Sequence, residues 1–275
     1  MLSKIALVGC KGSGKSSVAN IFAGNDKFEV KTDIDSCTTK TDIYQNYQNG
    51  NIEIFDTQGL NYKDETDVKT FQEMIKNFKK DQLNAIFLVV NGEVCLIDEG
   101  LKTIIREICK LFMGKYIWTQ IGIIITHYGY KEEQQNKVKQ REGDFVKEVL
   151  DIAEKEYQEI IRNQDENNKT CDPNEKIVTN LKSFYVNAKR KENGQYDTNT
   201  LEEIEKIKQL VKDYPPINKV QSKFYFLNMI NIVKALLITR YFSYRFFICK
   251  NTFIHIRSSI LSLLFFYKSF INYFF

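Results

Sequence analysis

The chain has 275 residues, which is enough for one domain of about 200 residues and an extension. Its six cysteines include no CxxC pair and no histidine-flanked spacing that would suit zinc, which excludes a zinc finger and favours a reduced, cytoplasmic compartment. Met1 leads almost directly into an apolar run, so we expect no targeting segment.

Charge divides the chain into two parts. Of the 39 Lys and Arg residues, eight lie beyond Pro216, where the chain has no Asp or Glu. Removing these eight leaves 31 basic against 35 acidic side chains, a net charge of −4 for residues 1–215, whereas the whole chain carries +4. Pro215-Pro216 marks this change in composition. We therefore expect a folded domain at 1–215 and a basic, aromatic tail at 216–275.

Apolar residues occur in runs of strand length and at helical spacing, and the two patterns alternate. In chain order, the expected elements are a strand at 4–8, a helix through residue 22, paired strands at 41–48 and 51–56, a helix around 68–78, a strand at 85–90, a helix at 101–111, a strand at 121–125, a long helix around 145–161, a strand at 183–186 and a helix at 201–211. Asn49-Gly50 is typical of a type I′ hairpin turn between the paired strands. The polar segment 162–176 is expected to be a surface loop. The alternation predicts an α/β fold of three layers, with a mostly parallel, doubly wound sheet and helices on both faces.

One motif lies between the first strand and the first helix. The residues from Gly9 to Ser16 match the P-loop pattern GxxxxGK[ST]. Its glycines let backbone N–H groups surround the β- and γ-phosphates of a nucleotide, Lys15 neutralises phosphate charge, and the Ser16 hydroxyl ligates Mg²⁺. The phosphate-binding residues that we expect are Lys11, Gly12, Ser13, Gly14, Lys15, Ser16, Ser17 and Gly59.

A second box, DTQG, ends the second strand of the hairpin. Here the carboxylate of Asp56 would hold Mg²⁺ through water, and the N–H of Gly59 would meet the γ-phosphate. The loop before the hairpin contains several hydroxyls, and we choose Thr39 as the switch residue that closes over Mg²⁺, with Thr38 and Thr41 as alternatives. An ordinary polar loop is the competing interpretation. The predicted metal ligands are Ser16, Thr39 and Asp56, and the predicted catalytic residues are Lys15 and Thr39.

From about Lys4 to Lys189 the chain resembles the GIMAP, or AIG-type, immunity-associated GTPases, which are relatives of septins and of plastid-import receptor GTPases. The resemblance rests on the segments GCKGSGKSS, TTKT, DTQGL, NAIFLVVNGEVCLIDEGLKTIIREI and GIIITHYG. It implies a P-loop GTPase fold that binds GTP and GDP with Mg²⁺ as cofactor. It also implies slow hydrolysis and GTP-dependent pairing through the switch face.

The fourth box departs from the family pattern. It reads Thr126-His127-Tyr128-Gly129-Tyr130 and has no carboxylate to pair with guanine. His127 is the predicted base-binding residue, by stacking or hydrogen bonding, and Glu132 or Glu133 is an alternative source of the missing charge. The fifth box is expected at Val186–Lys189, where Asn187 would lie near the base.

The second box also departs from the pattern. Leu60 follows DTQG, so the glutamine that orients water in Ras-like enzymes is absent. Gln58 is the same residue type as the missing glutamine, but nothing in the sequence directs its side chain to the γ-phosphate. The family usually has proline at this position. Cys10 and Cys37 would lie near the nucleotide, and we interpret them as buried, inert residues in preference to a redox switch.

The tail contains many aromatic residues, but basic residues interrupt every window of the length that a simple transmembrane helix needs. Two interpretations remain open. One is a basic, aromatic anchor on an anionic membrane, and the other is read-through from a faulty gene model.

Three functions are compatible with these features. The first is a slow GTPase that acts as a nucleotide-dependent switch or self-assembling scaffold. The second is a GTP-gated membrane scaffold with negligible turnover, and the third is an adenine-specific P-loop ATPase or kinase, because the acidic base reader is missing. The expected partners are guanine nucleotide, a second copy of the chain in a GTP-dependent homodimer or oligomer and an anionic membrane, with no nucleic acid. We expect a cytoplasmic protein that the tail can associate with a membrane.

Overall fold

The computed structural model describes residues 2–30, 44–60, 65–80, 82–93, 97–112, 115–128, 132–163, 177, 180–191 and 193–217. The chain divides into two units, Met1–Lys223 and Phe224–Phe275, and every described residue belongs to the first. In chain order, the elements are β1 (Ser3–Val8), α1 (Lys15–Ala23), β2 (Tyr44–Asn49), β3 (Ile52–Thr57), α2 (Glu65–Lys80), β4 (Ala85–Asn91), α3 (Glu99–Phe112), the 3₁₀ helix η1 (Lys115–Gln120), β5 (Ile121–Thr126), α4 (Glu132–Arg162), β6 (Lys182–Tyr185) and α5 (Thr198–Lys212).

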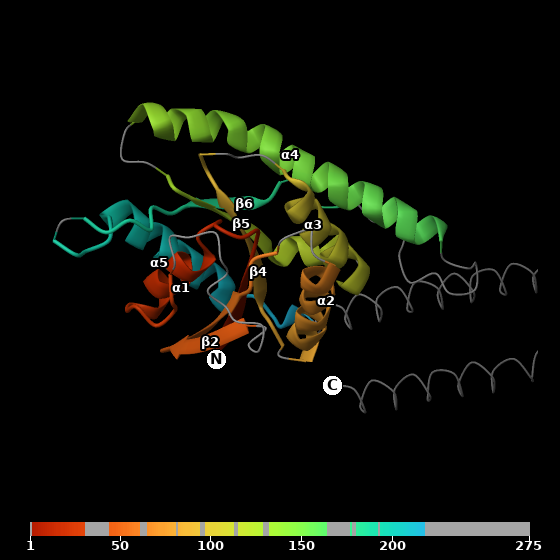
Figure 1. Ribbon diagram of the computed structural model, residues 1–275, viewed down its shortest axis with the longest axis horizontal. Helices are drawn as coiled ribbons and strands as arrows, with labels where there is room; N and C mark the ends of the chain where they lie inside the picture. Colours follow the sequence, from red (N-terminus) through yellow and green to blue (C-terminus); the bar gives the residue numbers. More distant parts are fainter. Residues whose placement is uncertain are drawn as a thin grey trace, which may run out of the picture. The chain divides into compact units, whose positions relative to one another are not determined.

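The described strands form one sheet of six, in the order β2-β3-β1-β4-β5-β6 (Figure 1). Only the β2–β3 pair is antiparallel, and the other four pairs are parallel. Parallel pairing aligns the carboxyl ends of the strands, as the partners Leu7 and Asp56 show for β1 and β3. The loops that follow β1, β3, β5 and β6 therefore meet at one edge of the sheet, where open α/β sheets bind ligands.

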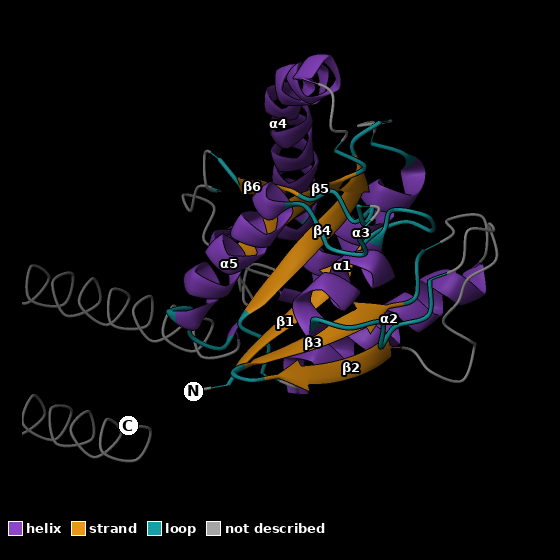
Figure 2. Cartoon of the chain, turned by 90° about the vertical axis from the view of Figure 1, so that its left-hand side faces the viewer, coloured by secondary structure: helices purple, strands orange, loops and turns teal. Residues whose placement is uncertain are grey.

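Helices cover both faces of the sheet, which confirms the predicted three-layer α/β fold. Successive residues of a strand point to opposite faces, so Ile5 and Leu7 pack with α1 and α5, whereas Ala6 and Val8 pack with α2, α3 and α4 (Figure 2). The two apolar clusters are buried on either side of the strands. They provide the rigid support for the loops at the carboxyl edge.

Three local features differ from the prediction. The hairpin pairs Asn49 with Ile52, so Gly50 and Asn51 form its two-residue turn. Among the described residues, Gly50 has a φ of 59°, whereas only Gln82 and His127 are non-glycine residues with positive φ, so the turn follows the type II′ pattern instead of type I′. In addition, η1 was not predicted, and α4 begins well before the apolar spacing that indicated it. The predicted loop 162–176 lies almost wholly outside the described residues.

The chain after α5 is packed under the amino edge of the sheet. Asn84 donates its side-chain N–H to the carbonyl of Tyr214 over 2.6 Å, and Gln120 does the same to Pro215 over 2.6 Å. The N–H of Ile217 binds the carbonyl of Leu83 over 2.7 Å, and the Ile217 side chain is only 2% exposed. The described structure thus extends to Ile217, which packs against the segment before β4.

No helix within the described ranges combines the length and apolarity needed to cross a membrane. Residues 218–275, which contain almost all of the predicted tail, lie outside those ranges, so the division at 215 and 216 stays a prediction.

Candidate nucleotide site

The loop between β1 and α1 is shaped by its glycines and leaves the start of the helix open. Gly14 has a φ of 92° and caps α1 without any side-chain hydrogen bond, and the first turn of α1 has no acidic residue. A Cβ atom at Gly14 would lie 3.2 Å from a side-chain carbon of Thr126. The first N–H groups of α1 are thus available to an anion, as a P-loop requires.

Lys15 folds back over this loop. Its ammonium group donates a hydrogen bond to the carbonyl of Cys10 over 2.9 Å, and the N–H of Ser13 binds the same carbonyl over 3.3 Å. The Lys15 side chain is only 6% exposed, which is unusual for a lysine. The charge is therefore held at the concave side of the loop, where phosphate oxygens would be neutralised.

Asp56 lies at the end of β3 beside the start of α1. It is 3% exposed, and its Oδ1 atom has no hydrogen-bond partner among the described residues. Burial raises the pKa of the Asp56 carboxyl, whereas a hydrogen bond with Ser16 and the charge of Lys15 act in the opposite direction. The buried hydroxyl of Ser13 also lacks a partner in the described part of the chain. Buried oxygen atoms without partners are what a hydrated Mg²⁺ ion and a phosphate would bind, so these residues fit both groups.

The DTQG box packs directly on the P-loop. A Cβ atom at Gly59 would lie 2.7 Å from Cα of Lys11 and 2.9 Å from Nζ of Lys15, so only glycine fits here. The next residue, Leu60, donates its N–H to the carbonyl of Gly9 over 3.3 Å, and its side chain is buried in the apolar cluster under α2 and α3. Leu60 is thus a packing residue and offers no group that could orient water.

The fourth box begins with Thr126, whose hydroxyl joins β5 to the P-loop. This hydroxyl lies 2.7 Å from the carbonyl oxygen of Ser13, 3.1 Å from that of Val90 and 3.0 Å from Nδ1 of His127. Carbonyl oxygens can only accept, so they compete for the single hydroxyl proton, and the tautomer of the His127 ring decides whether its Nδ1 donates to the hydroxyl or accepts from it. The residue is exposed and has a φ of 53°.

The fifth box lies beside the fourth. Ile125 and Tyr185 are register partners in β5 and β6, so His127 and Asn187, each two residues further on, follow neighbouring strand ends. Asn187 is buried, and its N–H and carbonyl both bind the hydroxyl of Thr200, over 3.0 and 3.3 Å. Its side-chain oxygen accepts the N–H of Lys189 over 3.1 Å. Asn187 therefore shapes the loop after β6.

Two aromatic residues support the fourth box from the α4 side. The ring of Tyr128 packs on the ring of Tyr185 with centroids 4.7 Å apart, and the Tyr185 hydroxyl donates to the carboxylate of Glu142 on α4. In contrast, Glu132 and Glu133 are exposed in the first turn of α4, and Glu133 pairs with Lys137 over 2.6 Å. Among the described residues, no hydrogen bond or ion pair joins either glutamate to His127 or Asn187.

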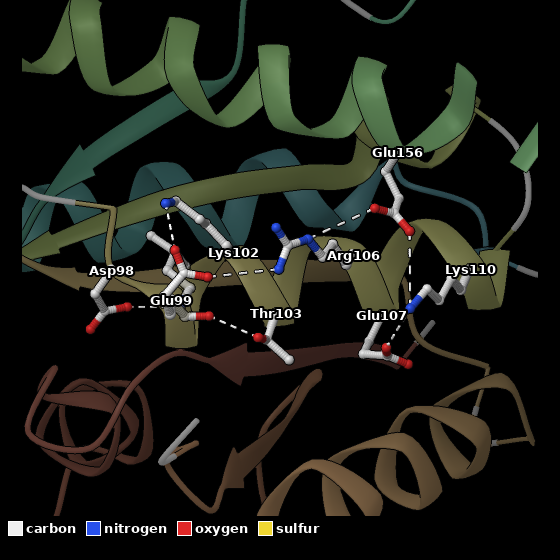
Figure 3. Close-up of polar contacts among 9 residues, drawn as sticks. Asp98, Glu99, Lys102, Thr103, Arg106, Glu107, Lys110 and Glu156 are labelled. Atoms are coloured by element: carbon white, nitrogen blue, oxygen red, sulfur yellow. Dashed lines mark hydrogen bonds and ion pairs between the residues drawn. The ribbon is translucent and has the colours of Figure 1, made fainter. Parts of the chain in front are cut away.

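A further contact joins the P-loop to α3. The thiol of Cys10 lies against Asp98, the residue before α3, and burial together with this carboxylate raises the pKa of the thiol to about 12. Figure 3 shows a separate set of ion pairs along α3, in which Arg106 pairs with Glu99 of the same helix over 3.8 Å and with Glu156 of α4 over 3.9 Å. Cys10 is therefore a protonated thiol, which fits the prediction of an inert residue, but it is partly exposed and not buried as expected.

Comparison with known families decides the relationship. The AIG1 family matches residues 3–215. The chain belongs to the AIG1 family. Its described fold is that of a P-loop G domain, which confirms the resemblance drawn from the motifs. A search of curated proteins found no match.

Solved structures similar to this AIG1 domain include Toc33 from Arabidopsis thaliana in complex with Mg²⁺ and GMPPNP, at 16% identity and a TM-score of 0.52, covering 78% of this chain and 86% of Toc33. The complex of Toc33 with GDP and Mg²⁺ has 14% identity, the same TM-score of 0.52 and the same coverage of 78% and 86%. These likenesses show a shared fold.

The structure of this AIG1 domain brings together most of the residues that the motifs predicted. Thr39, its alternatives Thr38 and Thr41, and Cys37 lie outside the described residues, as does Gly129. Asp98 was missed. Its contact with Cys10 joins residues 88 positions apart, and no spacing rule predicts such a pair.

Proposed function

We propose that the chain binds Mg-GTP and Mg-GDP, and that it hydrolyses GTP slowly as a nucleotide-dependent switch or self-assembling scaffold. The observation that carries the proposal is the convergence of Lys15, Asp56 and Gly59 on one loop, where the described part of the chain holds no partner for a buried carboxylate oxygen of Asp56 and the hydroxyl of Ser13. The solved complexes of Toc33 with Mg²⁺ and either GMPPNP or GDP support it by analogy of fold.

Each residue would have a defined task. Backbone N–H groups from Lys11 to Ser17 would surround the phosphates, and Lys15 would neutralise them. Ser16 and Asp56, with Thr39 from the switch segment, would hold Mg²⁺ directly or through water. The bound ion would supply charge stabilisation to the β- and γ-phosphates.

Guanine preference would depend on His127. In the tautomer that donates from Nδ1 to the Thr126 hydroxyl, Nε2 of His127 would accept from the N–H donors on the guanine edge, in place of the carboxylate that the family usually has. Asn187 would support the base from the neighbouring loop through its own turn geometry.

Turnover would be slow for an isolated copy. Leu60 is buried and has no polar group, so a residue of another segment or of a second copy must help to activate water. We therefore propose GTP-dependent pairing through the switch face into a homodimer or oligomer. We also propose a cytoplasmic location with membrane association through residues 216–275.

Competition binding tests the nucleotide proposal. A fluorescent GDP analogue is bound to the full chain with Mg²⁺ and is then challenged with GDP, GTP or ATP. We expect displacement by GDP and GTP and little by ATP. Lys15→Ala should abolish binding, whereas Lys137→Ala, which removes an exposed α4 lysine, should not change it. Equal displacement by ATP would favour the adenine-specific alternative, and binding that survives Lys15→Ala would refute the P-loop assignment.

A further inference from the structure

An arginine just beyond the fifth box crosses to the end of α1. Arg190 donates from Nη2 to the carboxylate of Asp26, a residue 164 positions earlier in the chain. Its guanidinium also lies over the ring of Tyr196, 5.0 Å from the centroid, and Nη2 donates to the Tyr196 hydroxyl over 3.3 Å. The ring holds the guanidinium in place, so the ion pair loses less side-chain entropy than an ordinary surface pair.

The acidic partner belongs to a well-fixed turn. The amide of Asn20 binds both backbone groups of Phe28, donating to its carbonyl over 2.8 Å and accepting its N–H over 2.7 Å. At the end of α1, Asn49 from β2 donates to the carbonyl groups of Phe22 and Ala23 over 3.0 and 3.1 Å. Asp26 is thus presented from a rigid support that immediately precedes the switch segment.

The basic partner belongs to the loop of residues 186–197, which follows β6 and contains Asn187. At the start of the loop, the N–H of Asn187 binds the hydroxyl of Thr200. At its end, Asp197 caps α5 by accepting the N–H of Asn199 over 3.2 Å. Between these anchors, the loop reaches the α1 side of the site through Arg190. Since α1 and α5 cover the same face of the sheet (Figure 1), the contact is between neighbouring parts of one layer.

We propose that the Arg190–Asp26 pair, braced by Tyr196, is a clasp that holds the loop of residues 186–197 against the turn after α1 and slows the escape of bound guanine nucleotide. The proposal rests on the nucleotide site proposed above. A base beside Asn187 would lie against this loop, so we expect movement of the loop away from its neighbours to limit release of the base. Every contact that must break when the loop moves raises the barrier to nucleotide release. Arg190 is then a positioning residue that acts on the base through the loop.

The dissociation rate of nucleotide measures the clasp. The full chain is loaded with fluorescent GDP and Mg²⁺, excess unlabelled GDP is added, and the fluorescence decay is followed. Arg190→Ala and Asp26→Ala should each speed release about three- to fivefold, the upper part of the range for an exposed ion pair. The double variant should release no faster than either single variant, because one interaction is lost in all three. Exchanging the two residues, with Asp26→Arg and Arg190→Asp together, should restore part of the slow release.

A matched control comes from α5. Lys208 pairs with Glu205 of the same helix over 2.6 Å, with side chains 29% and 61% exposed, compared with 39% and 67% for Arg190 and Asp26. Lys208→Ala removes the same positive charge, but from a pair that lies within one helix and connects no two elements. The GDP release rate of this variant should therefore equal that of the unaltered chain. Thermal melting of all variants should agree within about 4 °C, since surface pairs contribute little to stability.

Salt provides a test on the unaltered chain. At 1 M NaCl the screening length is about 3 Å, so release should accelerate toward the rate of Arg190→Ala, whereas that variant should change little. Release that is unaffected by both salt and substitution would overturn the clasp alone and leave the nucleotide site standing. Equal acceleration by Lys208→Ala would also overturn it. An unaltered chain that binds no GDP would overturn both proposals.

Discussion

The thiol of Cys10 in the P-loop donates a hydrogen bond to Oδ1 of Asp98 over 3.2 Å, and the same oxygen accepts the N–H of Leu101 over 2.8 Å. The Asp98 carboxylate thus binds both the phosphate loop and the first turn of α3. Because a carboxylate can only accept, the contact requires a protonated thiol.

The raised pKa of Cys10, about 12, predicts low reactivity. A thiol is alkylated as its thiolate, so at pH 8 iodoacetamide should modify Cys10 at least about tenfold more slowly in the folded chain than in the urea-unfolded chain. Asp98→Ala removes the negative neighbour and should speed the reaction. Mass spectrometry of the Cys10 peptide gives the rate, and rapid labelling in the folded chain would contradict the buried contact. The same pKa shift predicts how stability depends on pH. A group whose pKa is raised on folding adds to the free energy of unfolding below its unfolded pKa, and this contribution is lost as the pH rises toward 12.

Asp56→Asn should make the nucleotide-free chain more stable while it destroys Mg²⁺-dependent binding. The buried carboxylate has a raised pKa and an oxygen without a partner in the described structure, so its charge opposes folding until a cation is bound. We expect the melting temperature to rise by about 2–4 °C, the shift that about 1 kcal/mol produces in a domain of this size. Calorimetry without Mg-GDP measures the stability of the nucleotide-free chain, and calorimetry with Mg-GDP measures whether the ligand still raises the melting temperature. A lower melting temperature without ligand would show that Asp56 already has a stabilising partner.

Gly59→Ala should weaken nucleotide binding about tenfold or more. The new methyl group would meet the backbone of Lys11 and the ammonium of Lys15 at less than 3 Å, and overpacking of this kind costs about 1–3 kcal/mol. Gly143→Ala is the control, because a Cβ there meets nothing within 4 Å and alanine favours the α4 helix. Isothermal titration with GDP compares the two variants, and equal affinities would show that Gly59 does not position the P-loop.

Ile217→Ala should destabilise the full chain by about 2–5 kcal/mol, because the side chain is buried and its loss leaves a cavity. Leu201→Ala on α5 removes a similar side chain that is 44% exposed, and it should cost less than about 1 kcal/mol. Urea unfolding measures both. A negligible effect at Ile217 would place the end of the domain at the predicted residue 215.

His127→Ala should weaken GDP binding about tenfold, the value of one good contact to a base. Asn187→Ala should weaken it less if the histidine is the principal base contact, because the Asn187 side chain is already engaged with the N–H of Lys189. The fluorescent GDP assay ranks the two variants. The reverse order would move base reading to the loop after β6.

The P-loop and the DTQG box could be predicted because their chemistry needs particular residues at fixed spacing along the chain. The layers could be predicted because alternating strand and helix patterns restrict the topology. By contrast, the hydrogen bond from Thr126 to Ser13 spans 113 residues, and it arises only when β5 and the P-loop meet at the sheet edge. The turn at Gly50 was displaced by one residue because register, which sequence does not show, decides which residues are central.

The packing of residues 213–217 has a consequence for how the domain can be held. Leu83 and Asn84 precede β4, and Gln120 precedes β5, so the polypeptide leaves the described domain from the pole opposite the P-loop. A tether, label or surface attached after Ile217 would therefore be joined to the domain near the amino ends of β4 and β5, on the side away from the P-loop.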